Sequence, residues 1–214
     1  MRRMSLFILV SATGLAFGAA SVQAANLIAN GGFEDGVYTS SIGGNTNTQV
    51  PVDWDSTAAF DLEPGFNHVT SSNPHSGLSA LSISNFDDQP LATLTQTFGD
   101  VAGDTYNVSF WAFDGGANAD ANAFLTAAVG SQSKTFDDSV ASYTEGTFTF
   151  VGTGSDTLSI AAQTNEGEWF ADDVSVTETG AVVPEPSTWA LVLIGFAGLG
   201  FAGYRASRRA VAAA

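Results

Sequence analysis

The sequence predicts an all-β domain, an antiparallel β-sandwich, from three observations. Short segments of alternating polar and apolar residues fill the middle of the chain, and the clearest is 105–113. Gly, Asn and Asp separate these segments at short intervals, as turn residues do. Outside the two ends of the chain, no long segment has the period of a helix. Many short strands joined by turns are typical of a sandwich or jelly roll.

Alternation also predicts which side chains of a strand face the core. In segment 105–113, one face carries Tyr106, Val108, Phe110 and Ala112. The other face carries Asn107, Ser109, Trp111 and Phe113. The remaining strands are predicted, in chain order, at 79–84, 91–98, 123–129, 146–151, 157–162 and 169–177.

The N-terminus has the order of parts of a secretory signal peptide. Arg2 and Arg3 form a positive start, an apolar stretch follows over 6–20, and Val22-Gln23-Ala24 offers small residues for cleavage. We therefore expect a signal peptide at 1–24, cleaved after Ala24 or one residue later. An N-terminal membrane anchor is the alternative, but the apolar stretch is short of the roughly 20 residues that a span needs.

The C-terminus carries a second address. Pro184-Glu185-Pro186 precedes an uncharged run at 189–204, which is followed by the basic end 205–209 with its three arginines. As a helix, the run would be roughly 24 Å long, barely enough for a hydrocarbon core of about 30 Å. The arginines should stay cytoplasmic by the positive-inside rule, which leaves the preceding domain on the far side of the membrane.

This tail, 184–209, resembles the PEP-CTERM sorting tail of Gram-negative bacteria in the order of its three parts. The resemblance implies that exosortase, a membrane-embedded cysteine protease, processes the chain near Pro184, Glu185 and Pro186. It also implies a membrane-held intermediate that ends at the cell surface or in the extracellular matrix, where such proteins accompany exopolysaccharide and biofilm. A plain tail anchor is the alternative.

Between the addresses lie the predicted domain, 25–178, and a linker, 179–183. Only Lys134 of the six Lys and Arg residues lies in this domain, whereas 21 of the 22 Asp and Glu residues do. The net charge is about −20, one positive against 21 negative charges, and it opposes binding to nucleic acid. The absence of cysteine excludes disulfides, thiolate zinc sites and a cysteine nucleophile.

A second resemblance spans the domain. The opening 26–34 (NLIANGGFE), Pro51-Val52-Asp53-Trp54, the Ser76-Gly77 turn and the closing segment 169–176 (WFADDVSV) occur in one order. They are similar to landmarks of carbohydrate-binding modules with a galactose-binding-like jelly roll, which implies that fold. Related domains have many other functions, so sugar binding does not follow from the fold.

The same resemblance implies a structural calcium site formed by Glu34 and by Asp172 or Asp173. Alternation in the last strand places Asp172 on the inner face with Val174 and Val176, and Asp173 on the outer face. An inward carboxylate needs a partner, and calcium prefers carboxylate oxygens. Two solvated acids at the start of a strand are the alternative.

Exposed aromatic rings are the candidate glycan surface, because sugar rings stack their C–H faces on them. Trp111 is the preferred residue, since Asn107 and Ser109 on its face are polar. The sequence adds Phe113 and Trp169 as further rings, and Asn107 as a hydrogen-bonding partner. Burial in the core is the alternative for each ring.

No catalytic motif is assembled in the sequence, and adjacent aspartates on a strand point to opposite faces. We therefore expect a non-catalytic surface or matrix protein that binds polysaccharide, calcium or both. A purely structural or adhesive matrix protein without a sugar site is the second hypothesis, and a surface glycoside hydrolase is a remote third.

Overall fold

The computed structural model describes two units of the chain separately. In the unit 24–181 it describes residues 24–42, 44, 47–116, 122–137, 140–164 and 167–180. In the second unit, which combines the two ends of the chain, it describes 190, 192–199 and 201. The predicted signal peptide up to residue 23, the Pro184-Glu185-Pro186 motif and the basic end 205–209 lie outside the described residues.

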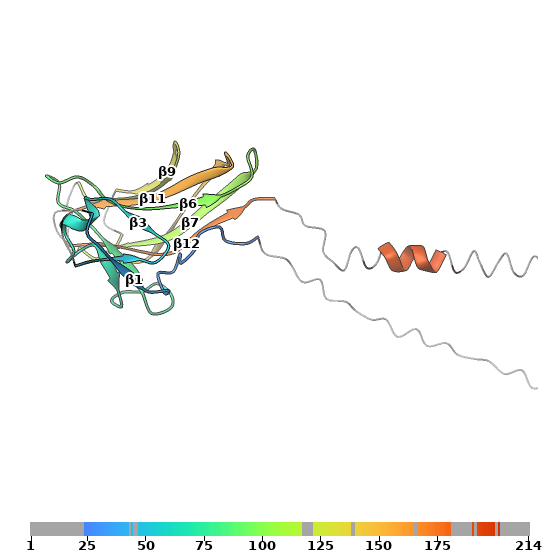
Figure 1. Ribbon diagram of the computed structural model, residues 1–214, viewed down its shortest axis with the longest axis horizontal. Coiled ribbons are helices and arrows are strands. Elements are labelled where there is room, and N and C mark those ends of the chain that lie inside the picture. The colour runs from blue at the N-terminus through green and yellow to red at the C-terminus, as the bar shows by residue number, and fades with distance from the viewer. Residues whose placement is uncertain are drawn as a thin grey trace, which may run out of the picture. The chain divides into compact units, whose positions relative to one another are not determined.

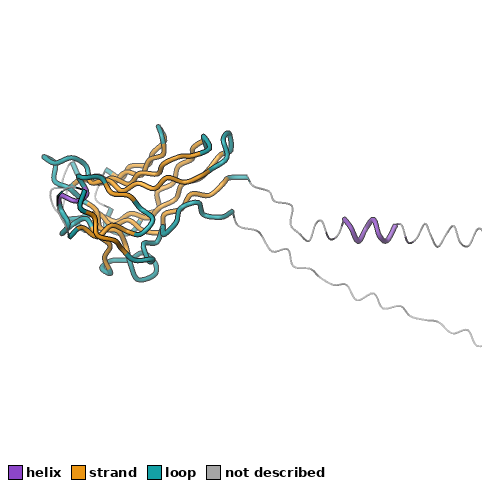
Figure 2. The backbone as a smooth tube through the Cα atoms, in the orientation of Figure 1, coloured by secondary structure: helices purple, strands orange, loops and turns teal. Residues whose placement is uncertain are grey.

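The domain is a sandwich of two five-stranded antiparallel sheets (Figures 1 and 2), which confirms the predicted fold class. The first sheet has the order β10-β7-β12-β5-β4, with β10 at Thr144–Val151, β7 at Thr105–Asp114, β12 at Trp169–Glu178, β5 at Ala80–Ile83 and β4 at His68–Thr70. The second has the order β3-β6-β11-β8-β9, with β3 at Asp55–Ser56, β6 at Ala92–Gly99, β11 at Ser155–Gln163, β8 at Phe124–Val129 and β9 at Gln132–Phe136.

Smaller elements complete the domain. β1 at Val37–Ser40 pairs with β2 at Thr48–Pro51, and a 3₁₀ turn, η1, covers Phe60–Leu62. All seven predicted strands are present. The sequence patterns do not predict β1–β4 or β9. Like β5, which is predicted, these strands have five residues or fewer, and alternation over so short a length is only weakly distinctive.

The core lies between the two sheets. The predicted inner face of β7, from Tyr106 to Ala112, is buried there, opposite buried leucine and isoleucine side chains of β6 and β11. Trp54 closes the core near the N-terminal segment: its ring packs against Phe33 with centroids 5.7 Å apart, and its Nε1 donates to the Asn30 carbonyl. Trp54 therefore contributes to packing.

A β-bulge in β12 decides which of its side chains face the core. The pairing with β7 shifts between Asp172 and Ser175, and Asp173 has a φ of 49°, in the left-handed region. Trp169 and Ala171 face the core before the bulge, and Val174 and Val176 face it afterwards. The predicted placement of Asp172 beside Val174 is therefore wrong: Asp172 pairs with Trp111 and shares the outer face of the sheet with it.

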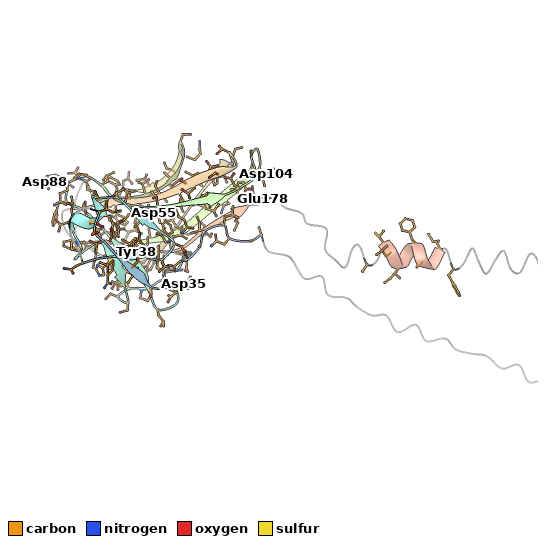
Figure 3. All side chains as sticks on the ribbon, viewed as in Figure 1. Asp35, Tyr38, Asp55, Asp88, Asp104 and Glu178 are labelled. Carbon is orange, nitrogen blue, oxygen red and sulfur yellow. The ribbon has the colours of Figure 1, made fainter. Side chains whose placement is uncertain are left out.

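The two ends of the sandwich differ in the loops that they carry. β7 begins and β12 finishes at the same end, where the amide N and the Oγ1 of Thr179 both donate to the Thr105 carbonyl at 2.8 Å. Figure 3 shows Asp104 and Glu178 at this end and Asp88 at the other. The segment that leads into β8 and the C-terminal end of β11 lie at the Asp88 end, where Asn122 and Gln163 both donate to Asp87. The β8–β9 turn and the segment that precedes β11 lie at the opposite end, where the Gly152 amide donates to the Asp104 carbonyl.

The predicted apolar helix 189–204 lies only partly within the described residues: 190, 192–199 and 201 are described, and all of these are helical. Among the helices that the structure describes, none combines the length and the apolar character that a membrane span requires.

Candidate functional site

Asp172 is the centre of a carboxylate cluster on the outer face of the first sheet. Its side chain is 0 % exposed because the turn 75–79, between β4 and β5, covers it. Oδ2 accepts hydrogen bonds from the amides of His75 at 2.8 Å and Ser76 at 3.1 Å, and Oδ1 accepts one from Asp173 at 2.7 Å. Burial raises the pKa of the Asp172 carboxyl, and these three amides oppose the rise.

Glu34 holds the other half of the same turn. Its Oε1 accepts from the amides of Leu78 at 2.6 Å and Ser79 at 2.9 Å. These two hydrogen bonds hold the pKa of the exposed carboxyl below its usual value of 4.5. Gly77 between the two carboxylates has a φ of 62°, and a Cβ there would overlap Glu34 Oε1, so the turn requires glycine at this position.

Asp173 binds the turn through side chains. Its Oδ1 accepts from Ser76 Oγ at 2.6 Å, and its Oδ2 lies 2.6 Å from His75 Nδ1. The His75 ring stacks on Trp111, with centroids 4.0 Å apart and planes inclined by 16°, and meets Tyr143 edge-on at 5.0 Å. Glu34, Asp172 and Asp173 thus clamp one turn against the sheet.

A pH titration can isolate the contribution of Glu34. Because its pKa is lower in the folded state, Glu34 contributes stability above its usual value of 4.5, and this stability is lost as the pH falls toward the folded pKa. Asp172, whose folded pKa is raised, works in the opposite direction. We expect the urea midpoint of Glu34→Gln to approach that of the wild type as the pH is lowered from neutral to about 3.

Glu178→Gln, at the other end of the domain, is the matched control for the loss of one charge. A difference between Glu34→Gln and the wild type that stays constant over the whole pH range would contradict the role given to the two amides.

Of the predicted calcium ligands, Asp172 and Asp173 each place an oxygen near Gly32, whereas Glu34 approaches it only with its Cγ. A Cβ on Gly32 would lie 3.9 Å from Asp173 Oδ1, 4.0 Å from Asp172 Oδ1 and 3.9 Å from Glu34 Cγ. Within the described residues, however, no three His, Cys, Asp or Glu side chains are grouped so that they could hold a metal ion. An ion that takes 6–8 oxygens would therefore need backbone carbonyls as most of its ligands here.

The predicted glycan residues divide into two groups. Asn107, Trp111 and Phe113 lie half-buried on the outer face of β7, as alternation predicts, but His75 is stacked on the Trp111 ring. Phe113 packs against Phe170, with centroids 5.7 Å apart. A sugar ring could use the stacked face of Trp111 only if the clamped turn moved away.

Trp169 cannot belong to a glycan surface, and its prediction as a binding residue is wrong. The side chain is 0 % exposed, in the core between the sheets. Counting alternation back from Val174 places Trp169 outside, but the bulge in β12 reverses the count and turns this ring inward.

A polar hollow lies on the outer face of the second sheet, and sequence reasoning does not identify it. It measures about 410 Å³ and is lined by Asp87, Asn122, Ala123, Phe124, Asp137 and Gln163. The Asp87 carboxylate accepts from Asn122 Nδ2 at 2.7 Å and from Gln163 Nε2 at 2.9 Å. Phe124 and Gln163 are paired neighbours on β8 and β11, so the half-buried ring stands beside the amide network.

One sequence signal could have indicated this hollow. In β8 the buried residues are Leu125, Ala127 and Val129, so alternation places Phe124 on the outer face, where a large apolar ring is unusual. The polar residues of the hollow come from distant parts of the chain: Asp87 lies 35 residues before Asn122 and 76 residues before Gln163, and no local pattern predicts those contacts.

The carboxyl groups of Asp100 and Asp156 interact directly at the other end of the domain. Burial and the contact with Asp156 raise the pKa of Asp100. The two carboxylates of a glycosidase stand roughly 5–10 Å apart across a cleft. A directly contacting pair does not have that geometry, so it gives no support to a hydrolase.

Comparison with known proteins supports the prediction for the C-terminal tail and the fold of the domain. Residues 182–209 match the family model of the PEP-CTERM protein-sorting motif, which confirms the prediction for the tail. No match was found among curated proteins.

Among solved structures, the chain is similar to TmCBM61 in complex with β-1,4-galactotriose, with 17% identity over 72% of this chain and 99% of that one, at a TM-score of 0.50. It is also similar to the CBM22-1 xylan-binding domain of Paenibacillus barcinonensis Xyn10C, with 13% identity over 76% and 100% and a TM-score of 0.45. At 17% identity, the likeness to TmCBM61 shows the fold alone, a jelly roll like that of a carbohydrate-binding module.

Proposed function

We propose that this protein is a non-catalytic carbohydrate-binding protein of the cell surface or extracellular matrix of a Gram-negative bacterium, where it associates with exopolysaccharide or biofilm. The PEP-CTERM motif implies export, a membrane-anchored sorting intermediate and processing by exosortase. The observation that carries the binding function is the hollow at Phe124, where an accessible ring stands beside two amides and two carboxylates.

The chemistry of the hollow suits a saccharide. A sugar needs an apolar platform for its C–H face and several convergent groups for its hydroxyls, and small-molecule sites combine these two features. The outer face of the same sheet adds small hydroxyl side chains, with exposed Asp55 beside Thr95 at its edge. The hydroxyl side chains are those of Thr93, Thr95, Thr97, Thr126, Thr135, Thr157 and Ser159. An extended glycan could lie across them without displacing any part of the protein.

A glycan array tests this proposal by comparing two variants, one at the hollow, Phe124→Ala, and one at the other candidate surface, Trp111→Ala. We expect Phe124→Ala to weaken binding at least about tenfold, because the anchor residue of a site typically contributes more than about 1.4 kcal/mol. Trp111→Ala should bind as the wild type does once it is folded. Val101→Ala, which removes an exposed apolar side chain at the far end, is the control.

Loss of glycan binding with Trp111→Ala, together with unchanged binding by Phe124→Ala, would instead assign the site to the outer face of β7. Binding of no glycan at all would favour the second hypothesis, a structural or adhesive matrix protein. Recovery of the tagged protein in the matrix fraction of the native host would support the proposed location.

Calcium at the carboxylate cluster is the second part of the proposal. It is supported by Asp172 and Asp173, whose Oδ1 atoms both lie near Gly32, on the turn that Glu34 also binds. If an ion binds there, added calcium should raise the melting temperature and a chelator should lower it, because a ligand of the native state alone stabilises it. A melting temperature that is the same in calcium and in chelator would leave the turn held by hydrogen bonds only.

A further inference from the structure

The charge around the hollow at Phe124 bears on the class of sugar that it can accept. Asp87 and Asp137 both line the hollow, and Asp88, at the same end of the domain, adds a third carboxylate. None of its lining residues is basic among those that the structure describes. The local charge thus has the sign of the whole domain, which has 21 acidic residues and one lysine.

The single lysine does not change this sign at the hollow. Lys134 and Phe136 lie on the inner face of β9, and the Lys134 ammonium stands 5.1 Å from the centre of the Phe136 ring. Thr135 between them is on the outer face, where its hydroxyl donates to Thr126. The one lysine of the domain therefore lies at the edge of the core and not on the outer face of the sheet.

Asp87 is fixed in its position as a hydrogen-bond acceptor. Both of its oxygens accept an amide N–H, from Asn122 and from Gln163, so the carboxylate is oriented before any ligand arrives. Phe124 lines the same hollow, and the faces of an aromatic ring are negative. A fixed carboxylate near a ring attracts an ammonium group and repels a carboxylate.

From these observations we propose that the hollow at Phe124 selects polysaccharides with free amino groups, that is, partly or wholly N-deacetylated hexosamine polymers, over uronic acid polymers. The inference rests on the proposed carbohydrate-binding function and names its ligand class. The hexosamine ammonium lies by Asp87 and Asp137, and the C–H face of the sugar lies on Phe124. No covalent step is involved.

Calorimetry on the full chain in a neutral detergent tests the inference with three oligomers of equal length. These are glucosamine, N-acetylglucosamine and galacturonate oligomers, at a mildly acidic pH that keeps the amine protonated. We expect the glucosamine oligomer to bind about tenfold or more tightly than the acetylated one at low salt, and the preference to shrink as salt screens the charges. The galacturonate oligomer should bind least.

Asp137→Asn should reduce the preference for the amine over the acetylated form. Asp104→Asn, which makes the same change of net charge at the other end of the domain, should leave that ratio as it is. An equal reduction by both variants would mean that net charge, not the hollow, sets the preference, and would overturn the site.

The remaining outcomes separate the inference from the function on which it rests. Equal affinity for the amine and acetylated oligomers, or tighter binding of galacturonate, would overturn the inference and leave carbohydrate binding intact. Failure of all three oligomers, together with an array on which no glycan binds, would overturn both.

Discussion

Asp172→Ala is expected to destabilise the domain by about 3–5 kcal/mol, because it leaves three partly buried amides without their shared, completely buried acceptor. Those amides belong to His75, Ser76 and Asp173, and the first two fix the turn 75–79 on the sheet. The lost acceptor cannot be replaced locally, since the side chain is completely buried. The melting temperature should fall by roughly 10 °C in a domain of this size.

Asp55→Ala is the control, because Asp55 is an exposed acid on the short edge strand β3. It should change the free energy of unfolding by no more than about 0.5 kcal/mol. An Asp172→Ala variant within that same margin would show that the turn is held by the contacts of Glu34 and Asp173 alone.

Gly31→Ala is expected to cost about 2–4 kcal/mol, for a reason that lies in the backbone. Gly31 packs on β12, where its carbonyl accepts from the Val174 amide at 2.9 Å. A Cβ on Gly31 would overlap the Val174 carbonyl oxygen, so the two chain segments would have to separate and weaken that hydrogen bond. Denaturant unfolding measures the loss directly.

Gly65→Ala provides the comparison for this prediction. A Cβ there meets no atom within 4 Å, and the variant should unfold at nearly the wild-type midpoint. Similar midpoints for Gly31→Ala and Gly65→Ala would mean that the N-terminal segment can shift away from β12 without loss.

The strand pattern was predictable from the sequence because it is local. In β7, five pairs of inner and outer residues alternate without interruption, and the structure keeps that alternation from Thr105 to Asp114. The short strands β3 and β4 take their positions from the edges of the sheets that they join, and β1 and β2 pair only with each other, so their own residues carry little information.

The bulge in β12 accounts for the two wrong predictions at the site, the orientations of Asp172 and Trp169. The bulge in β12 breaks the alternation, so Asp172 lies outside and Trp169 inside, the reverse of the count from Val174. The left-handed conformation of Asp173 makes the bulge possible, and nothing in the neighbouring sequence requires it. Asp172 is nonetheless buried as expected, because a turn almost 100 residues earlier in the chain covers it.

The hollow at Phe124 could be predicted only in part, for a related reason. The outward position of the ring follows from alternation in β8, whereas its partner Asp87 arrives from another loop, 76 residues before Gln163. Sites of this kind are assembled by the topology, and residue spacing along the chain does not show them.

The central place of β12 in the first sheet has a consequence for the order in which the protein can mature. This last strand lies between β7 and β5, and it also supplies the carbonyl that binds the Leu27 amide of the N-terminal segment. Until β12 arrives, the sheet is divided and the start of the domain lacks its partner. The sandwich can therefore close only after almost its whole chain has emerged from the export machinery, at the moment when the sorting tail follows.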